Sequence, residues 1–376
     1  MGMPFVFGKS LDGQSFIGRE REVSKLASNI TYQKNTLVLS SRGWGKTSLL
    51  DMAISKARSR DYQLRICRIS LYDVPSPERF CSVFASAVIR ATSANLSEAV
   101  AAVKKYLQGT SPLMDAETDS LADFSITFGT SEALSTMSQV LGLPELIAKD
   151  RNYKVVVCID DFHNVASYPD PKSFIDNLDS RWSLHKMASY CLFADRNEVT
   201  EGMKTGFRIF ATGGQVIDLG AISQDTFINY IRSSFADTGK YIDEEAASLV
   251  VSLVGGHPYY VQQLAQQSWL RTGVVCPKET VIEAHDTMAD VMSLVFKTLT
   301  ESLTQQQLCY MRALLCGERI ISTAEVLHRY GISSATSASR SKSALLSRNI
   351  IELTDGNVMI KDPVYAYWLK TRYFKI

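Results

Sequence analysis

The sequence predicts an α/β fold in which a doubly wound parallel sheet is followed by a helical domain and a winged helix-turn-helix. In the first two-thirds of the chain, short apolar runs alternate with helical stretches, as in a parallel sheet with helices on both faces. A glycine-rich loop at residues 43–47 joins the first apolar run to an amphipathic helix. From Ser223 onward the apolar spacing becomes helical, and a hairpin signal follows near the C-terminus.

The composition is that of a globular chain. The 376 residues suffice for two or three domains, 45% are apolar, and the formal net charge is +1. Neither a disordered chain nor a globally basic one is indicated. The apolar runs fall well short of the roughly 18 residues of a membrane span. We therefore expect no membrane segment.

The cysteines and the first residues bear on the compartment. The seven cysteines are odd in number and include no Cys-x-x-Cys pair, so neither a disulfide framework nor a zinc site is expected. Residues 1–4 carry no basic segment followed by an apolar core, so no secretory signal is expected. These features favour a cytoplasmic protein.

Residues 1–220 form the first predicted domain. Its strands are expected at residues 36–39, 64–69, 155–159, 189–193 and 216–219. The run at 155–159 is continuously apolar, as in a strand buried on both faces. A helix is expected at 46–58, where apolar residues recur on one face. Residues 91–150 are predicted to be a helical insert with a strand-like alternation at 124–128, and its function is not indicated.

Residues 221–303 form the second predicted domain, a helical lid. The acidic residues 243–245 suit the first turn of a helix, which Gly255 and Gly256 end. Pro258 suits the first turn of the helix that follows.

Residues 304–376 form the third predicted domain, the winged helix-turn-helix. Helices are expected at residues 304–316, 323–330 and 334–348, with Gly331 as the turn and the last helix in the recognition position. Asp355-Gly356 between two short strands is a strong hairpin signal and would form the wing.

The loop after the first strand carries a phosphate-binding pattern. It fits G-x-x-x-x-G-K-[ST], except that Ser40 replaces the first glycine. Such a loop curls its N–H groups around a phosphate, the lysine reaches the β and γ oxygens, and the hydroxyl of Thr47 binds Mg²⁺. The strand before the loop and the helix after it favour this interpretation over a chance match. The candidate phosphate-binding residues are Ser41, Arg42, Gly43, Trp44, Gly45, Lys46, Thr47 and Ser48.

Two acidic residues follow the buried strand at 155–159. A carboxylate at the end of a parallel strand is where Mg²⁺ needs a ligand, and Asp160 is the candidate. Asp161 is the candidate catalytic residue that polarises the attacking water, and the alternative is an acid that caps the next turn. His163 is interpreted as a structural histidine, with the alternative that it orients Asp161.

These motifs resemble a family over nearly the whole chain. The chain is similar to the bacterial and archaeal AAA+-like P-loop ATPases of the STAND class, the signal-transduction ATPases with numerous domains. The matching segments are Phe16-Ile17-Gly18-Arg19-Glu20-Arg21-Glu22, Arg42-Gly43-Trp44-Gly45-Lys46-Thr47-Ser48-Leu49-Leu50, Ile159-Asp160-Asp161-Phe162, Gly255-Gly256-His257-Pro258-Tyr259-Tyr260 and Asp362-Pro363-Val364-Tyr365-Ala366-Tyr367-Trp368-Leu369.

The resemblance implies a nucleotide switch. ADP would hold the lid and the winged helix closed, and exchange for ATP would open them. Ile17, Gly18 and Arg19 would then lie near the adenine, while His257 and Pro258 would contact the nucleotide and report its state. From local chemistry alone, Gly-Gly-His-Pro is equally a helix stop followed by a helix start.

Three departures from the family pattern concern turnover more than binding. Ser40 replaces a glycine, and Asp161 stands where many relatives carry the longer glutamate. Ala194-Asp195-Arg196 replaces an expected Gly-Ser-Lys/Arg and so removes a hydroxyl that would sense the γ-phosphate. Arg196 is a candidate for positive charge at that place, and the plainer interpretation is a surface arginine.

Residues 304–376 carry ten Lys/Arg and five Asp/Glu, net +5, which leaves −4 for the rest of the chain. Yet the predicted recognition helix offers only Arg340, Lys342 and Arg348 as basic residues, so few phosphate contacts are expected. Packing of the winged helix within the molecule is favoured over nucleic-acid binding, by analogy of fold.

The leading hypothesis is therefore a slow, Mg²⁺-dependent ATPase that binds ATP or ADP and acts as a conformational switch, with a protein partner or oligomerisation on ATP binding. One alternative is an ATP-regulated DNA-binding protein. Another is a scaffold that is stabilised by nucleotide without hydrolysing it.

Overall fold

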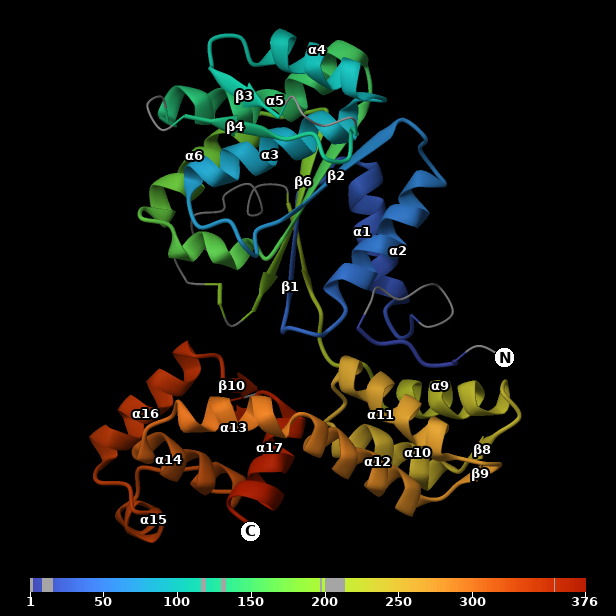
Figure 1. The fold of residues 1–376 in the computed structure, drawn as a ribbon, viewed down its shortest axis with the longest axis vertical. Helices are drawn as coiled ribbons and strands as arrows, with labels where there is room; N and C mark the ends of the chain where they lie inside the picture. The colour runs from blue at the N-terminus through green and yellow to red at the C-terminus, as the bar shows by residue number, and fades with distance from the viewer. Residues whose placement is uncertain are drawn as a thin grey trace. The chain divides into compact units, whose positions relative to one another are not determined.

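The computed structural model describes residues 3–8, 16–115, 120–129, 133–196, 198–199, 214–354 and 356–376. Internal contacts divide the chain into two compact units. We call residues 12–220 the sheet unit, and residues 1–11 with 221–376 the helical unit, and each is described by itself (Figure 1).

The sheet unit alternates strands and helices. Its elements are α1 (Glu20–Thr31), β1 (Thr36–Ser40), α2 (Lys46–Arg58), β2 (Leu64–Ser70), α3 (Pro77–Thr92), α4 (Leu96–Tyr106), β3 (Pro112–Met114), β4 (Ile126–Phe128), α5 (Ala133–Arg151), β5 (Lys154–Asp160), the 3₁₀ turn η2 (Phe162–Ser167), α6 (Pro171–Trp182), β6 (Ala188–Asp195) and β7 (Gln215–Asp218). Helix α2 has the predicted bounds, and each predicted strand lies within two residues of its expected ends.

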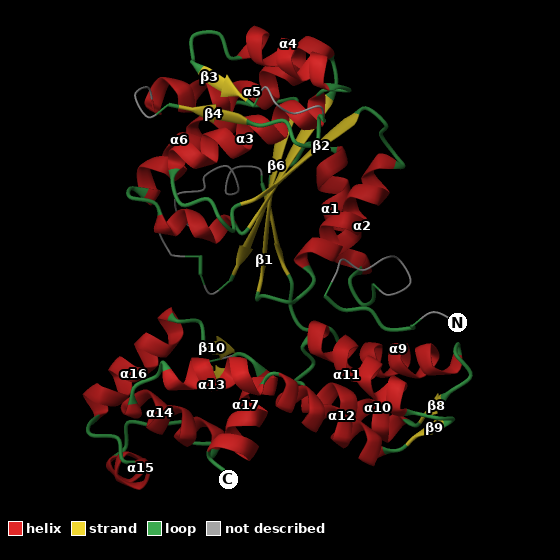
Figure 2. Ribbon diagram, in the orientation of Figure 1, coloured by secondary structure: helices red, strands yellow, loops and turns green. Residues whose placement is uncertain are grey.

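Five strands form one parallel sheet in the order β2-β5-β6-β1-β7. Figure 2 shows these strands with helices on either side. At one edge Ser40 of β1 lies opposite Asp195 of β6, and Ser70 of β2 lies opposite Asp160 of β5. The carboxyl ends of these four strands therefore meet along the edge that carries the predicted site. The parallel sheet with helices confirms the predicted α/β fold class.

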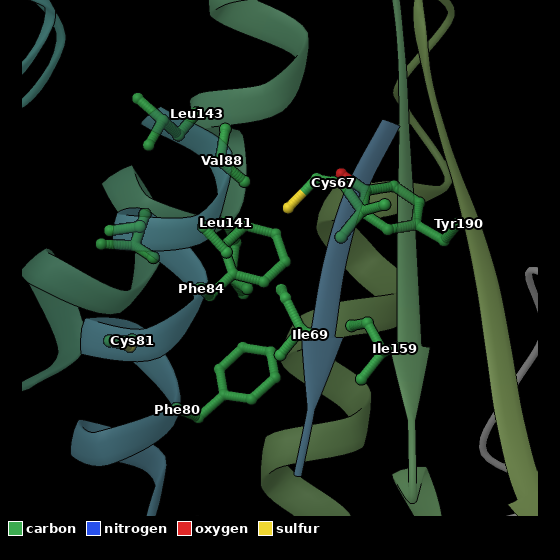
Figure 3. Close-up of a cluster of buried hydrophobic side chains, with 14 of the residues drawn as sticks. Cys67, Ile69, Phe80, Cys81, Phe84, Val88, Leu141, Leu143, Ile159 and Tyr190 are labelled. Carbon is green, nitrogen blue, oxygen red and sulfur yellow. The ribbon is translucent and has the colours of Figure 1, made fainter. Parts of the chain in front are cut away.

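Both faces of the sheet are buried. Helices α1 and α2 pack on one face, against β-strand residues that include Val38, Cys158 and Phe193. Helices α3, α5 and α6 pack on the other, where Ile69, Ile159 and other strand residues contact the aromatic side chains of α3 (Figure 3). Residues 155–159 are buried without exception, as the continuous apolar run predicts.

The insert at residues 91–150 contains α4, the β3–β4 hairpin and α5. The predicted strand at 124–128 forms only from Ile126 to Phe128, and it pairs with β3, which the sequence analysis did not predict. With three residues, one of them Pro112, β3 carries too little alternation to stand out in the sequence.

The helical unit follows. Its elements are α9 (Gln224–Ala236), β8 (Tyr241–Ile242), α10 (Glu244–Leu253), α11 (Pro258–Arg271), β9 (Val275–Cys276), α12 (Lys278–Val291), α13 (Ser293–Glu301), α14 (Gln305–Leu315), α15 (Ala324–Tyr330), α16 (Ala335–Ser347), β10 (Ile351–Thr354), β11 (Asn357–Ile360), α17 (Pro363–Trp368) and the π turn η3 (Leu369–Tyr373). The predicted acidic first turn is that of α10, where Asp243 caps the helix by accepting the N–H of Ala246 at 2.7 Å.

The predicted helix-turn-helix region has three helices and a hairpin. Gly331, in the left-handed region at φ 70°, ends α15 before α16 begins. Strands β10 and β11 pair antiparallel, with Thr354 opposite Asn357. Of the predicted hairpin residues, Asp355 lies outside the described residues, whereas Gly356 has φ 79°.

The N-terminal segment belongs to a different unit from the one expected. The sequence places residue 1 in the first domain, whereas residues 1–11 group with residues 221–376. Residues 3–8 pack within the helical unit, where Phe5 is fully buried against Tyr230 and Phe235. Gln266 donates to the carbonyl of Phe5 at 2.7 Å. Burial of Phe5 and the contacts of its neighbours, such as Phe7 with Tyr259, attach this segment to the helical unit.

Among the described helices, none is long and apolar enough to cross a membrane.

Candidate functional site

The glycine-rich loop leaves β1 and enters α2 directly. Gly43 and Gly45 have φ of 78° and 85°, a region that residues with a Cβ rarely adopt. Ser40 is buried at the end of β1 and has no positive φ, so serine fits where the pattern has glycine. The chain therefore passes from the end of β1 through a tight glycine loop into the amino end of α2, and helix amino ends of this kind favour anions.

Lys46 is the first residue of α2. Its ammonium lies 3.4 Å from the carbonyl and the hydroxyl of Ser40 and 3.3 Å from the carbonyl of Ser41. Phosphate oxygens would be stronger acceptors than these three oxygens. The neighbouring candidates differ in exposure: Arg42, Gly43 and Thr47 are exposed, Ser41, Trp44 and Gly45 are half-buried, and Ser48 is buried.

Asp160 ends β5 at the same edge of the sheet. One of its oxygens accepts the N–H of Asp161 at 2.9 Å. Burial and the neighbouring charge of Asp161 raise the pKa of Asp160, although the Asp161 N–H, Lys46 and His163 act in the opposite direction. Its negative charge is therefore incompletely compensated by the surrounding protein.

A divalent cation would compensate the negative charge of Asp160. The carboxylate of Asp160 and the exposed hydroxyl of Thr47 are oxygen ligands of the kind that Mg²⁺ prefers. Within the described part of the chain, no three His, Cys, Asp or Glu residues gather as a metal cage. Mg²⁺ usually takes only one or two protein ligands and completes its shell with phosphate and water.

Asp161 adopts a left-handed conformation with φ 55°, which aspartate tolerates better than most residues. Its carboxylate accepts the hydroxyl of Ser70, at 3.3 Å, from the end of β2. The same hydroxyl accepts the N–H of Tyr72 at 3.2 Å and is therefore fixed in direction. Ser70 is not predicted from the sequence, because a lone serine at the end of a strand carries no signal.

His163 has two partners, and neither is Asp161. Its Nδ1 accepts the N–H of Asp195 at 3.2 Å, and its Nε2 lies 2.9 Å from a carboxylate oxygen of Glu198. The ring thus joins η2 to the chain that leaves β6. Glu198 is a second residue that the sequence analysis missed.

Arg196 follows β6 directly. Its N–H donates to the carbonyl of Ser40 at 3.2 Å, which places it beside the start of the phosphate loop. Its guanidinium pairs with Asp218 and donates to the carbonyl of Leu219 at 3.3 Å. The backbone of Arg196 therefore lies at the loop, while its charge is directed to the end of β7.

The N-terminal motif precedes α1. Ile17 is half-buried, and the N–H of Gly18 donates to Glu20 at 3.3 Å. Arg19 is 4% exposed, donates to the carbonyl of Gly220 at 2.7 Å and lies 3.6 Å from Glu22. Burial lowers the pKa of Arg19. This arginine ties the motif to the chain that leaves β7.

His257 and Pro258 belong to the helical unit. They connect α10 to α11, and the ring of His257 lies 4.9 Å from that of Tyr260. Their predicted contact with a nucleotide stays a prediction, as does the placement of Ile17, Gly18 and Arg19 near an adenine.

Comparison with known proteins agrees with the fold. The family model described as Novel STAND NTPase 1 matches residues 7–316. The Walker-type ATPase PABY2304 of Pyrococcus abyssi has a similar structure, with a TM-score of 0.65 and 14% identity over 98% of this chain and 100% of that one. No curated protein matches the chain.

Two further solved structures are similar. The Aeropyrum pernix ORC1 protein in complex with DNA has a TM-score of 0.52 and 14% identity, covering 96% of this chain and 94% of that one. The ADP form of the Aeropyrum pernix ORC2 protein has a TM-score of 0.50 and 11% identity, covering 96% and 92%. At these identities the likeness shows the fold alone.

Proposed function

Because the chain belongs to the Novel STAND NTPase 1 family, we propose that it binds ATP or ADP with Mg²⁺ and works as a slow ATPase and conformational switch in the cytoplasm. One observation carries the proposal. Gly43 and Gly45 hold the loop in left-handed conformations directly before Lys46 at the start of α2. A tight glycine loop that enters a helix in this way is the backbone arrangement whose N–H groups bind phosphate.

Each site residue has a role in this proposal. The N–H groups of residues 41–48 and the ammonium of Lys46 bind the phosphates, and Thr47 with Asp160 holds the metal. Mg²⁺, when bound, neutralises charge on the phosphate oxygens. Asp161 orients the attacking water, with its carboxylate held by Ser70.

The switch would involve the helical unit. Contacts inside this unit connect the α10–α11 turn to α17: Tyr260 donates to Asp362 at 2.6 Å, and a Cβ placed on Gly255 would lie 4.0 Å from Pro363. If His257 and Pro258 sense the nucleotide, these contacts would carry a change to α17. A protein partner, or a second copy of the chain on ATP binding, would then read the new state.

A second candidate function is ATP-regulated DNA binding through a winged helix. Helices α14, α15 and α16, with the β10–β11 hairpin, support this domain assignment. The DNA complex of the Aeropyrum pernix ORC1 protein, similar in fold, motivates the test. Of the three basic residues at α16, Arg340 is exposed, but Arg348 donates to the carbonyl of Ser302 at 3.0 Å. The few available charges favour a role within the molecule.

Retention on duplex DNA separates these two functions. DNA binding requires salt-sensitive retention that the Arg340→Ala/Lys342→Ala variant loses, whereas the internal role predicts weak retention that the variant leaves unchanged.

A third candidate is a scaffold that binds nucleotide without hydrolysis. It is supported by Arg196, whose guanidinium pairs with Asp218 rather than remaining available to a phosphate. Tight nucleotide binding without phosphate release would favour it over the ATPase.

Substitution of Lys46 tests the binding proposal. Lys46→Ala removes the side-chain cation from the loop, so titration with Mg-ATP should show at least about a 100-fold loss of affinity, from charged hydrogen bonds worth ~1.5–3 kcal/mol each. Thermal unfolding without ligand should change little.

Lys56→Ala is the matched control. Lys56 lies in the same helix and donates to Ser24 at 2.8 Å on an exposed surface. Its removal should leave ATP affinity unchanged. Equal affinity in Lys46→Ala and the unmodified protein would refute the phosphate site.

A further inference from the structure

The carboxyl end of β6 lies between the two halves of the proposed site. In the sheet, β6 separates β5, which carries Asp160, from β1, which leads into the phosphate loop. Asp160 would hold the metal that neutralises the charge of a bound nucleoside triphosphate, and the phosphate loop would hold its phosphates. The terminal phosphate should therefore face the end of β6 at Asp195 and the residue that follows it, Arg196. This step rests on the proposed function.

The pairing of β6 with its two neighbouring strands ends at different residues. Toward β1 the register continues to its last residue, where Asp195 lies opposite Ser40. Toward β5 it ends at Leu192 opposite Ile159. Beyond that point the N–H of Asp195 donates to Nδ1 of His163 rather than to a strand. The ring of His163 therefore accepts the hydrogen bond that a residue of β5 would accept if the two strands stayed paired.

The hydrogen bonds of His163 fix its ring in one orientation. Nδ1 accepts from Asp195, so the proton of the neutral ring is on Nε2, 2.9 Å from the carboxylate of Glu198. The side chain is 12% exposed. One ring nitrogen of His163 contacts Asp195 and the other contacts Glu198, and we call this pair of contacts the clamp. The N–H of Arg196, the residue after Asp195, donates to the carbonyl of Ser40.

We propose that His163 is a positioning residue for the terminal phosphate. By clamping Asp195 and Glu198, it sets the distance between the exit of β6 and the phosphate loop, and so the room left for a third phosphate. ADP lacks that phosphate. Loss of the clamp should therefore lower the affinity for ATP more than the affinity for ADP. A general loss of folding would lower both affinities.

The test measures the affinities of the full chain for ATP and ADP, each with Mg²⁺, by titration calorimetry. His163→Phe keeps the ring size but removes both hydrogen bonds. We expect the ratio of ATP to ADP affinity to fall about 5- to 10-fold, the magnitude of a lost hydrogen bond. His163→Asn, whose Oδ1 lies where Nδ1 does and can accept the N–H of Asp195, should restore most of the ratio.

Two further variants keep the test decisive. His185→Asn replaces another partly buried histidine of the same unit, one that contacts Tyr190 near the opposite end of β6, and should leave the ratio unchanged. If His163→Phe fails to fold, Glu198→Gln weakens the same clamp at a half-buried residue. It should shift the ratio in the same direction.

The outcomes distinguish the two proposals. An unmodified chain that binds neither nucleotide would overturn the proposed function. An unmodified chain that binds both, with an unchanged ratio in His163→Phe or Glu198→Gln, would overturn the role of His163 alone. Equal losses for ATP and ADP that His163→Asn does not restore would also overturn it, because they indicate a structural role only.

Discussion

Two adjacent carboxyl groups end β5, and the protein holds them in different ways. Asp160 is half-buried, and burial together with the neighbouring charge of Asp161 raises its pKa. A cation would compensate the negative charge of Asp160. Asp161 has a left-handed backbone conformation, and its carboxylate accepts the hydroxyl of Ser70. The difference supports separate roles, Asp160 for the metal and Asp161 for the water.

Asp161→Asn tests the catalytic role. The amide can still accept the Ser70 hydroxyl but cannot accept a proton, so the rate of phosphate release should fall about 10²- to 10⁴-fold. Affinity for Mg-ATP should stay within about threefold. Release of phosphate would be measured at saturating ATP.

Asp51→Asn provides the comparison, since Asp51 pairs with Arg68 on the surface of the same unit. The Asp51→Asn variant should release phosphate at the rate of the unmodified protein. An Asp161→Asn protein that also does so would remove Asp161 from the mechanism.

At this scale the sequence predicts residues with a motif and misses those without one. Lys46 and Asp160 were predicted because their spacing and strand context are specific. Ser70 and Glu198 were not, because their contacts join segments that are 91 and 35 positions apart in the chain. Only the packed sheet brings such residues together.

At the scale of elements, the amino end of β6 is fastened by α5. A carboxylate oxygen of Glu145 accepts the N–H groups of Lys186, Met187 and Ala188 at 2.8–3.0 Å. Burial acts to raise the pKa of Glu145, but Lys149 and these N–H groups outweigh it and hold the pKa below its ordinary value. Beside them, burial lowers the pKa of His185 to about 4.

The low pKa of His185 makes the sheet unit sensitive to acid. The unfolded chain takes up the proton at a pKa of about 6.5, and the folded protein only near 4. The contribution of His185 to stability is therefore fully present above pH 6.5 and is lost as the pH falls toward 4. At pH 5 this loss should reach about 2 kcal/mol. Urea unfolding, followed by the fluorescence of the buried Trp182 that stacks on Tyr190, measures it.

His185→Asn isolates this contribution, because its side chain does not titrate. Between pH 7.5 and pH 5 the variant should lose about 2 kcal/mol less than the unmodified protein. Identical losses in the two proteins would show that His185 titrates normally when folded.

Sequence patterns predict where a single helix or strand lies better than they predict which strands pair. Helix α2 was predicted to the residue, because a glycine-rich loop precedes it and its apolar residues share a face. The order β2-β5-β6-β1-β7 could not be predicted, since apolar runs do not specify which strands pair. The short strand β3 was missed for lack of an alternating pattern.

At the scale of the whole molecule, the helical unit is built from both ends of the described chain. Phe5 fills its core between Tyr230 and Phe235, and its carbonyl accepts from Gln266. The sheet unit is therefore inserted between residues 1–11 and 221–376 of the other unit. Two covalent connections, rather than one, join the units.

Phe5→Ala tests this architecture. Truncating a fully buried phenylalanine should destabilise the helical unit by about 3–5 kcal/mol. Unfolding would be followed by the fluorescence of Trp269 and Trp368, both in that unit. Met3→Ala, at a residue 58% exposed, should have little effect. Equal stability of the two variants would mean that the segment is not part of the core.

The central claim is that the chain binds a nucleotide through its phosphate loop. The most direct measurement is the nucleotide content of freshly purified protein, released by denaturation and separated by ion-exchange chromatography, with Lys46→Ala in parallel. We predict close to one ADP per chain in the unmodified protein and almost none in the variant. Unmodified protein that carries no nucleotide, and takes up none from excess Mg-ATP, would contradict the claim.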